Sequence, residues 1–182
     1  MAKPNAAPVG MAGFGLSLWM FGMAAAGWYA HVLGMVAALA FILAGVVMVI
    51  VGILEYVQGS TLGTISFLTY GAFWLSLAYL VRHHAGISTP VFGWFFLLWA
   101  ALTFAFWLAS LRRELVLVLF FLALWLTFLL LALGLLGLGS VLIQISGYTA
   151  LIAALSVLYA ASAQSIREGS EGLLVLPVGR HM

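Results

Sequence analysis

The stretch from Leu115 to Gly137 reads LVLVLFFLALWLTFLLLALGLLG and contains no charged residue. A helix that rises 1.5 Å per residue needs roughly 17 to 25 mostly apolar residues to cross the hydrocarbon core of a bilayer, and this stretch meets that requirement. Strands of a membrane barrel are about half as long and alternate between apolar and polar residues. The stretch therefore predicts a membrane-spanning helix.

Five other stretches share this length and composition, and only short turns separate them. The six predicted spans cover residues of about 9–29, 32–53, 62–81, 91–111, 115–137 and 141–163. No turn is long enough to hold a separate domain. We expect an all-α integral membrane protein with one six-helix transmembrane domain over residues 1–182, in which residues 164–182 form a short cytoplasmic tail.

The composition of the whole chain agrees with this fold class. Of its 182 residues 66% are hydrophobic and 5% are charged, and the mean hydropathy is +1.28, whereas a soluble domain carries about 25% charged residues. The 6 Lys and Arg residues are scattered and form no patch that could neutralise nucleic-acid phosphates. We therefore expect the partner of this surface to be the lipid bilayer and expect no nucleic-acid partner.

Ionisable side chains are absent from the middle of every predicted span, and Glu55, at a helix end, comes closest. This pattern disfavours a pump with a buried carboxylate relay. An intramembrane protease is also disfavoured, because no span pairs a nucleophile with a His. We interpret His31, His83 and His84 as interfacial loop residues. We expect no enzyme activity, no metal and no cofactor.

Basic residues mark one side of the predicted bundle. With six spans the two termini share a side, which carries Lys3, Arg112, Arg113, Arg167 and Arg180. The opposite side carries only Arg82. Because cytoplasmic segments of membrane proteins are enriched in Lys and Arg, we expect a multi-pass protein of the cell membrane with both termini in the cytoplasm.

Small residues four positions apart in the first predicted span can be interpreted in two ways. Gly13 with Ser17, and Gly22 with Ala26, form smooth faces on which another helix can pack. Alternatively, Gly10 and Gly13 allow backbone donors and the positive end of the helix to approach an anion. Gly10 and Gly13 are therefore candidate substrate-binding residues.

Polar side chains recur at helical spacing in two other spans. One stripe consists of Ser66, Thr69, Tyr70 and Phe73, and the other of Gln144, Tyr148, Tyr159 and Ser162. Such groups can simply hydrogen-bond between helices, whereas two stripes in one bundle together favour a shared polar interior. The second interpretation predicts a channel or carrier for a small polar solute.

Four sequence blocks, in order along the chain, match a known set of signatures. Residues Asn5 to Gly15 are similar to Asn-Pro-Ala-Pro-Leu-Gly-Leu followed by Gly-Phe-Gly, with Ala6 in place of the first Pro. Residues Gly52 to Gly63 are similar to Gly-x-x-Glu-x-x-x-Gly-Asn-Thr-x-Gly, with Ser60 in place of Asn. Residues Ser66 to Trp74 and Leu176 to Gly179 are similar to Ser-Tyr-Gly-x-Phe-Trp and Leu-Pro-x-Gly. Together the blocks resemble the acetate uptake transporter family, the succinate-acetate permeases.

This resemblance implies a homohexamer in which each six-helix protomer has its own pore for acetate, and sometimes for succinate or other small carboxylates. It also implies an apolar constriction of three side chains, which fall on Phe14, Tyr70 and Leu124, with Ala123 as an alternative to Leu124. A specificity position falls on Val157. Ser66 and Thr69, which accompany Tyr70 on its predicted helix, are further candidates for substrate binding. The matched structural residues of the motifs are Asn5, Pro8, Glu55, Gly59 and Thr61.

Two alternatives to a carboxylate pathway stay open at this stage. A hexameric channel for a small neutral solute such as urea has the same six-helix architecture. A membrane assembly or signalling protein, in which the helices only pack, would move no solute. Flux of acetate compared with urea separates all three hypotheses.

Overall fold

The computed structural model describes residues 5–29, 33–83 and 88–179, and its regular structure in these ranges consists of helices, with no strand. The helices are α1 (Ala7–Ala25), α2 (Leu33–Leu39), η1 (Ala40–Val47), α3 (Met48–Gln58), α4 (Thr61–His83), α5 (Thr89–Ser110), α6 (Leu115–Leu133), η2 (Gly134–Leu138) and α7 (Ser140–Gly169). The segments η1 and η2 are π-helical.

These helices combine into 6 segments that are long and apolar enough to cross a membrane. The segments α2, η1 and α3 follow one another without a break and provide one span over Gly34–Gln58, and α6 continues through η2 to provide another over Leu115–Leu138. The prediction of an all-α protein with six membrane-spanning helices is confirmed. The chain is a multi-pass membrane protein.

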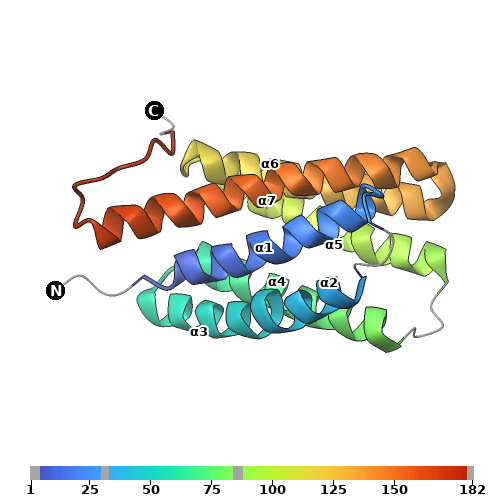
Figure 1. The fold of residues 1–182 in the computed structure, drawn as a ribbon, viewed down its shortest axis with the longest axis horizontal. Helices are drawn as coiled ribbons and strands as arrows, with labels where there is room; N and C mark the ends of the chain where they lie inside the picture. Colours follow the sequence, from blue (N-terminus) through green and yellow to red (C-terminus); the bar gives the residue numbers. More distant parts are fainter. Residues whose placement is uncertain (1–4, 30–32, 84–87, 180–182) are drawn as a thin grey trace.

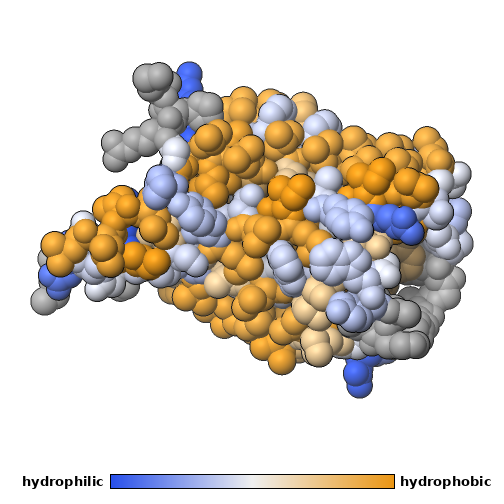
Figure 2. Space-filling model, turned by 45° about the horizontal axis from the view of Figure 1, so that its top comes forward, coloured by the Kyte–Doolittle hydropathy of each residue, from blue (hydrophilic) through white to orange (hydrophobic). Residues whose placement is uncertain are grey.

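The six spans run up and down along one common direction (Figure 1). Helix α1 begins and α7 ends at the same end of the bundle, and the α3–α4 and α5–α6 turns lie there too. We call this the terminal end, and the end that holds the η2–α7 turn the far end. Figure 2 shows hydrophobic side chains over most of the visible face and hydrophilic ones mainly toward the two ends, as expected for a surface that faces lipid.

Glycine and proline determine where several helices begin and end. Pro8 is the second residue of α1, where its missing N–H would have no partner within the helix anyway. Gly59 ends α3 with φ of 80°, and the N–H of Ser60 then donates to the carbonyl of Glu55 at 3.0 Å. Gly137 adopts φ of 100° at the end of the α6 and η2 span, where it permits the turn into α7.

Small residues of α1 allow two neighbouring helices to approach its backbone. A Cβ atom on Gly13 would lie 2.7 Å from the carbonyl oxygen of Leu43 in η1, and one on Gly22 would lie 3.0 Å from the carbonyl oxygen of Gly147 in α7. The hydroxyl of Ser17 donates to the carbonyl of Leu39, just before η1, at 3.2 Å. The contacts of these small residues are therefore those of helix packing. They are made with two different neighbours, the α2–η1 segment and α7.

Aromatic rings fill the centre of the bundle. Phe73 of α4 lies 4.9 Å from Trp99, 5.2 Å from Phe128 and 5.8 Å from Phe95, measured between ring centroids. Each such pair contributes about 0.5 to 1.5 kcal/mol beyond the burial of its surface. Phe73 thus joins α4 to α5 and α6 as a packing residue, although the sequence grouped it with the polar side chains of its helix.

The second polar stripe faces outward, so the prediction of one interior shared by both stripes is wrong. Gln144, Tyr148, Tyr159 and Ser162 of α7 are all exposed. The hydroxyl of Tyr159 donates to the carbonyl of Pro177 at 2.8 Å, and Tyr148 accepts a hydrogen bond of 3.4 Å from the indole of Trp28. The two tyrosines thus join α7 to neighbouring segments on its outer side.

Helix α7 continues past the sixth predicted span, which ends at Ala163, as far as Gly169. Its last turns carry Gln164, Arg167 and Glu168, which are too polar for the hydrocarbon core. The segment after the helix returns along the terminal end, where the N–H groups of Leu115 and Val116 donate to the carbonyls of Gly179 and Val178. The tail therefore satisfies backbone donors at the start of α6.

Candidate substrate pathway

A vestibule opens into the bundle from the terminal end. Its volume is about 230 Å³, far above the roughly 10 to 15 Å³ that a single water molecule requires. Four lining residues lie at or next to the helix ends that meet at the terminal end and so mark the mouth, namely Asn5, Glu55, Arg113 and Gln164. A small hydrated solute can therefore enter, and one cation, one carboxylate and two amides lie at the entrance.

The walls become apolar with depth. On each helix that lines the vestibule the residue farthest from the mouth is large or branched, namely Phe14 on α1, Tyr70 on α4, Phe121 on α6 and Val157 on α7, with Met48 of α3 beside them. Three residues that carry hydroxyl groups line the walls, namely Ser60, Ser66 and Tyr70. The vestibule therefore narrows onto an apolar floor that carries only a few hydroxyl groups.

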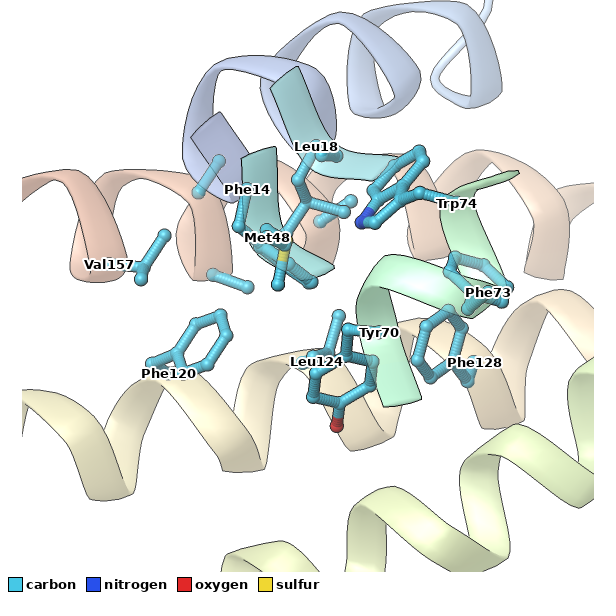
Figure 3. Close-up of a cluster of buried hydrophobic side chains, with 14 of the residues drawn as sticks. Phe14, Leu18, Met48, Tyr70, Phe73, Trp74, Phe120, Leu124, Phe128 and Val157 are labelled. Carbon is cyan, nitrogen blue, oxygen red and sulfur yellow. The ribbon is translucent and has the colours of Figure 1, made fainter. Parts of the chain in front are cut away.

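Phe14 occupies the centre of this floor. Its ring centroid lies 5.3 Å from Tyr70, 5.4 Å from Phe120 and 5.8 Å from Trp74, and all three contacts are edge-on. Figure 3 shows these rings between α1, α4 and α6. Only 2% of Phe14 and 1% of Tyr70 are exposed. The two predicted constriction residues with the clearest motif support are thus in direct contact and close the inner end of the vestibule.

Leu124 lies one helical turn deeper than Phe120 on α6 and is 0% exposed. It belongs to the same buried cluster as Phe14 and Tyr70, and Figure 3 shows it at the level of Tyr70 along the bundle. It does not line the vestibule, so it lies behind the floor. Ala123, the alternative, is also buried, and its carbonyl accepts a hydrogen bond from the Thr127 hydroxyl at 2.8 Å.

Thr103 of α5 fixes the hydroxyl of Tyr70. The two oxygen atoms lie 2.9 Å apart, and both side chains are buried. Because an unpaired buried hydroxyl is costly, this bond holds the phenol in one orientation at the floor. Sequence reasoning missed Thr103, although a hydroxyl in the middle of an otherwise apolar span was a usable signal.

The two other hydroxyl candidates on α4 behave differently from each other. Ser66 lines the vestibule, and its Oγ is buried without a hydrogen-bond partner among the described residues. Thr69 donates its hydroxyl to the carbonyl of Ile65 in the same helix at 2.6 Å and lies outside the vestibule lining. The structure therefore brings Ser66, but not Thr69, to Tyr70 and Phe14.

The structure places Gly10 and Gly13 away from the vestibule. A Cβ atom on Gly10 would lie 2.6 Å from the Phe67 ring, and Gly13 contacts the backbone of Leu43. Both glycines are buried in the faces by which α1 packs on its neighbours. Their contacts are those of close helix packing, and other residues of α1, Ala7, Met11 and Phe14, face the vestibule instead.

The matched turn between α3 and α4 holds a buried carboxylate beside the start of a helix. Glu55 is buried, and its Oε2 lies where a Cβ atom of Gly63 would be. Gly63 is in the first turn of α4, and a carboxylate near a helix N-terminus is stabilised by the helix dipole. Gly59 and Thr61 provide the turn and the first residue of α4. Glu55 thus has a structural position at the wall of the vestibule.

Asn5 joins the start of α1 to the end of α7 at the mouth. Its Oδ1 accepts a hydrogen bond from the N–H of Ala7 at 3.0 Å, and its Nδ2 donates to Glu168 Oε1 at 3.0 Å and more weakly to Gln164 at 3.4 Å. With Pro8 in the first turn, these bonds fix the direction in which α1 leaves the mouth. Asn5 also lines the vestibule itself.

His83 is the described member of the predicted loop histidines, since His31 and His84 lie outside the described residues. It stacks on Tyr79 with ring centroids 4.2 Å apart, and its Nδ1 lies 2.9 Å from the Tyr79 carbonyl. Within residues 5–29, 33–83 and 88–179 no three His or Glu side chains are grouped as a metal site would require. His83 therefore packs at the far end of α4.

The comparison with protein families gives a match over nearly the whole chain. The family described as GPR1/FUN34/yaaH matches residues 2–179. The chain belongs to this family. The resemblance to the acetate uptake transporters is thereby confirmed.

Relatives of this family occur in bacteria and yeast. The chain is 31% identical over 180 residues to the succinate-acetate/proton symporter SatP of Escherichia coli strain K12. This alignment covers 96% of this chain and 95% of the symporter. It is also 33% identical over 143 residues to accumulation of dyads protein 2 of Saccharomyces cerevisiae. That alignment covers 71% of this chain and 50% of the yeast protein. SatP is a symporter, so the comparison supports the prediction that this chain is not an enzyme.

A solved structure, that of the bacterial acetate channel SatP, has the same fold. It superposes with a TM-score of 0.92 at 30% sequence identity and covers 98% of this chain and 100% of the channel. The chain therefore has the fold of this channel over nearly its whole length.

Proposed function

We propose that this chain is a membrane channel or transporter that moves acetate and related small carboxylates, succinate among them, through the vestibule and past the constriction at Phe14 and Tyr70. The main support is the vestibule itself, which narrows onto a floor made of the two residues that match the family constriction. The relatives named symporter and acetate channel support the choice of solute.

The mouth suits an anion. Arg113 provides a positive charge there, and Gln164 provides an amide. Glu55 is the acidic side chain among the lining residues, and it lies against the start of α4. A single cation can attract a carboxylate without binding it tightly. Binding must be weak enough for the solute to leave, because conduction requires both entry and release.

The floor suits a solute with one small apolar end. Moving a bare carboxylate into an apolar region costs several kcal/mol even after the protein relaxes, so the apolar section must be short or the acid must enter protonated. The methyl group of acetate can pass the Phe14 ring while its oxygens contact the hydroxyls of Ser66 and Tyr70. The same floor should pass succinate, which is larger and doubly charged, more slowly than acetate.

Assembly and orientation complete the proposal. A homohexamer with one pore in each protomer is supported by the family resemblance and by apolar side chains on the outer faces, such as Leu98 and Leu119, which can face lipid or another copy. A cytoplasmic position for both termini is supported by Arg112, Arg113 and Arg167 at the terminal end, compared with Arg82 at the far end.

Uptake by reconstituted protein tests the proposal. Radiolabelled acetate should enter proteoliposomes much faster than it enters empty liposomes, and faster than urea enters the same proteoliposomes. Acceleration by an imposed pH gradient beyond that measured in empty liposomes would indicate coupling to protons, whereas an equal acceleration in both would indicate a channel. Urea uptake that exceeds acetate uptake would support a channel for a neutral solute. Absence of any flux would support a membrane assembly or signalling protein that moves no solute.

A further inference from the structure

Three residues of α4 form a row along one face of the helix. Ser66, Tyr70 and Trp74 are spaced by four residues, and all three are buried. Successive members of the row are about 6 Å apart along the helix axis. Ser66 and Tyr70 line the vestibule, whereas Trp74 lies one turn deeper, behind the floor.

The polar atoms of this row are satisfied in the middle and unsatisfied at both ends. The hydroxyl of Tyr70 pairs with Thr103 at 2.9 Å. Ser66 Oγ and Trp74 Nε1 are buried, and neither has a hydrogen-bond partner among the described residues. Buried polar groups are rarely left unpaired, so each of these two donors calls for an explanation.

Trp74 contacts Phe14 from one helical turn beyond Tyr70 and does not itself line the vestibule. The two rings meet edge-on with centroids 5.8 Å apart. Figure 3 shows the indole nitrogen on the edge of the ring that is turned toward Leu18 and Met48, away from Phe73. The N–H is therefore directed toward the side chains that surround Phe14 and not into the aromatic packing on the other side of α4.

We propose that Trp74 Nε1 donates a hydrogen bond to the carboxylate of the solute at a second subsite, immediately behind Phe14, and that Ser66 is the corresponding donor on the vestibule side. This inference rests on the proposed function. An indole N–H is a donor and cannot accept, so the subsite favours an anion. Hydrogen bonds to a charged group are stronger than neutral ones, and the carboxylate thus exchanges one donor for the next while its methyl group passes the ring.

Trp107 provides a matched control within the same chain. Its Nε1 is also buried without a partner in the described residues. Its ring instead stacks on Trp125 with centroids 6.1 Å apart, close to Phe104, and it does not line the vestibule. Trp74→Phe and Trp107→Phe therefore remove the same unpaired donor, one at the proposed subsite and one outside it.

Acetate uptake by the two variants in proteoliposomes tests the subsite. Trp74→Phe should raise the acetate concentration needed for half-maximal uptake by about tenfold or more, the effect of losing a hydrogen bond to a charged group, and Trp107→Phe should leave it unchanged. Equal uptake by Trp74→Phe and the parent would overturn the inference while leaving the proposed function intact. If the parent itself takes up no acetate, the proposed function fails.

A binding measurement keeps the test valid if Trp74→Phe does not fold. In the parent protein labelled with ¹⁵N-tryptophan, the indole N–H resonance of Trp74, assigned from single Trp→Phe variants of the other tryptophans, should move downfield as acetate is added. The Trp107 resonance should stay in place. Movement of neither resonance, or of both equally, would contradict the subsite.

Discussion

The stripe of α4 that contains Ser66 and Tyr70 is turned into the bundle, and the stripe of α7 that contains Tyr148, Tyr159 and Ser162 is turned out of it. Ser66 and Tyr70 are buried at the vestibule, whereas Tyr148, Tyr159 and Ser162 are exposed. Both sets follow helical spacing, and both contain Tyr and Ser. The difference therefore comes from what occupies the rest of each helix.

The buried face of α7 consists mainly of small residues, and the polar stripe lies outside that face. Ala150 and Ala154 are fully buried, and Gly147 lies directly against the backbone of Ala26 and Gly22 at the crossing with α1. Small residues allow two helices to approach closely. The face of α7 that carries them is therefore turned toward α1, and the polar stripe is left on the outside. In α4 the small Gly71 packs on Gly45 and Val49, and the neighbouring face, with Ser66 and Tyr70, is turned to the centre.

The largest effect is expected at the crossing of α1 and α7. Gly147→Leu places a side chain where the backbone of Ala26 and Gly22 already lies, so the two helices must separate. We expect a loss of stability above about 4 kcal/mol, the range of severe substitutions, and little folded protein in mild detergent. Thermal unfolding and size-exclusion elution measure this.

Gly169→Leu is the control for that variant. It lies in the same helix, and a Cβ atom there would meet nothing within 4 Å. Its unfolding temperature should match that of the parent. If Gly147→Leu elutes and unfolds as the parent does, the packing face of α7 has been assigned incorrectly.

The next largest effect is expected at the floor. Phe14→Ala removes a ring that contacts Tyr70, Trp74 and Phe120, so it should cost about 3 to 5 kcal/mol of stability and also widen the constriction. Among folded molecules, the uptake ratio of lactate to acetate should rise about tenfold or more, because a pocket discriminates by such factors for each small group.

Phe41→Ala serves as the comparison for Phe14→Ala, because Phe41 is exposed on η1. Its lactate to acetate ratio should equal that of the parent. An unchanged ratio in folded Phe14→Ala would show that Phe14 packs in the core without limiting solute size.

The fold could be predicted from the sequence because few backbone structures can span the hydrocarbon core of a membrane. Long uncharged stretches must form helices, since unpaired backbone groups are too costly in hydrocarbon, and the motif blocks placed Phe14 and Tyr70. Thr103 could not be paired with Tyr70 in advance, because the rotation of α5 about its axis depends on aromatic contacts such as Phe73 with Trp99. The outward turn of the α7 stripe likewise depends on the contact of Gly147 with α1.

A smaller effect is expected from the phenol hydroxyls of the two helices. Tyr70→Phe leaves the buried Thr103 hydroxyl without its partner at 2.9 Å, which should cost about 1 to 3 kcal/mol. It should also weaken acetate binding while the lactate to acetate ratio stays constant, because the ring remains. Tyr159→Phe removes an exposed bond to Pro177 and should cost less than about 1 kcal/mol.

Unfolding temperatures and acetate concentration curves for Tyr70→Phe and Tyr159→Phe test this pair. Equal losses of stability would remove the distinction between the buried and the exposed hydroxyl. An altered lactate to acetate ratio in Tyr70→Phe would show that the hydroxyl, and not the ring, limits solute size.

The most direct test of the pathway is one substitution made on each polar stripe, Ser66→Phe on α4 and Ser162→Phe on α7, with acetate uptake measured in proteoliposomes that contain equal amounts of folded protein. Ser66 lines the vestibule and Ser162 is exposed on the outer side of its helix. Ser66→Phe should fill the vestibule above Phe14 and reduce acetate uptake nearly to that of empty liposomes, while Ser162→Phe should transport as the parent does. Normal uptake by folded Ser66→Phe would contradict a pathway through this vestibule.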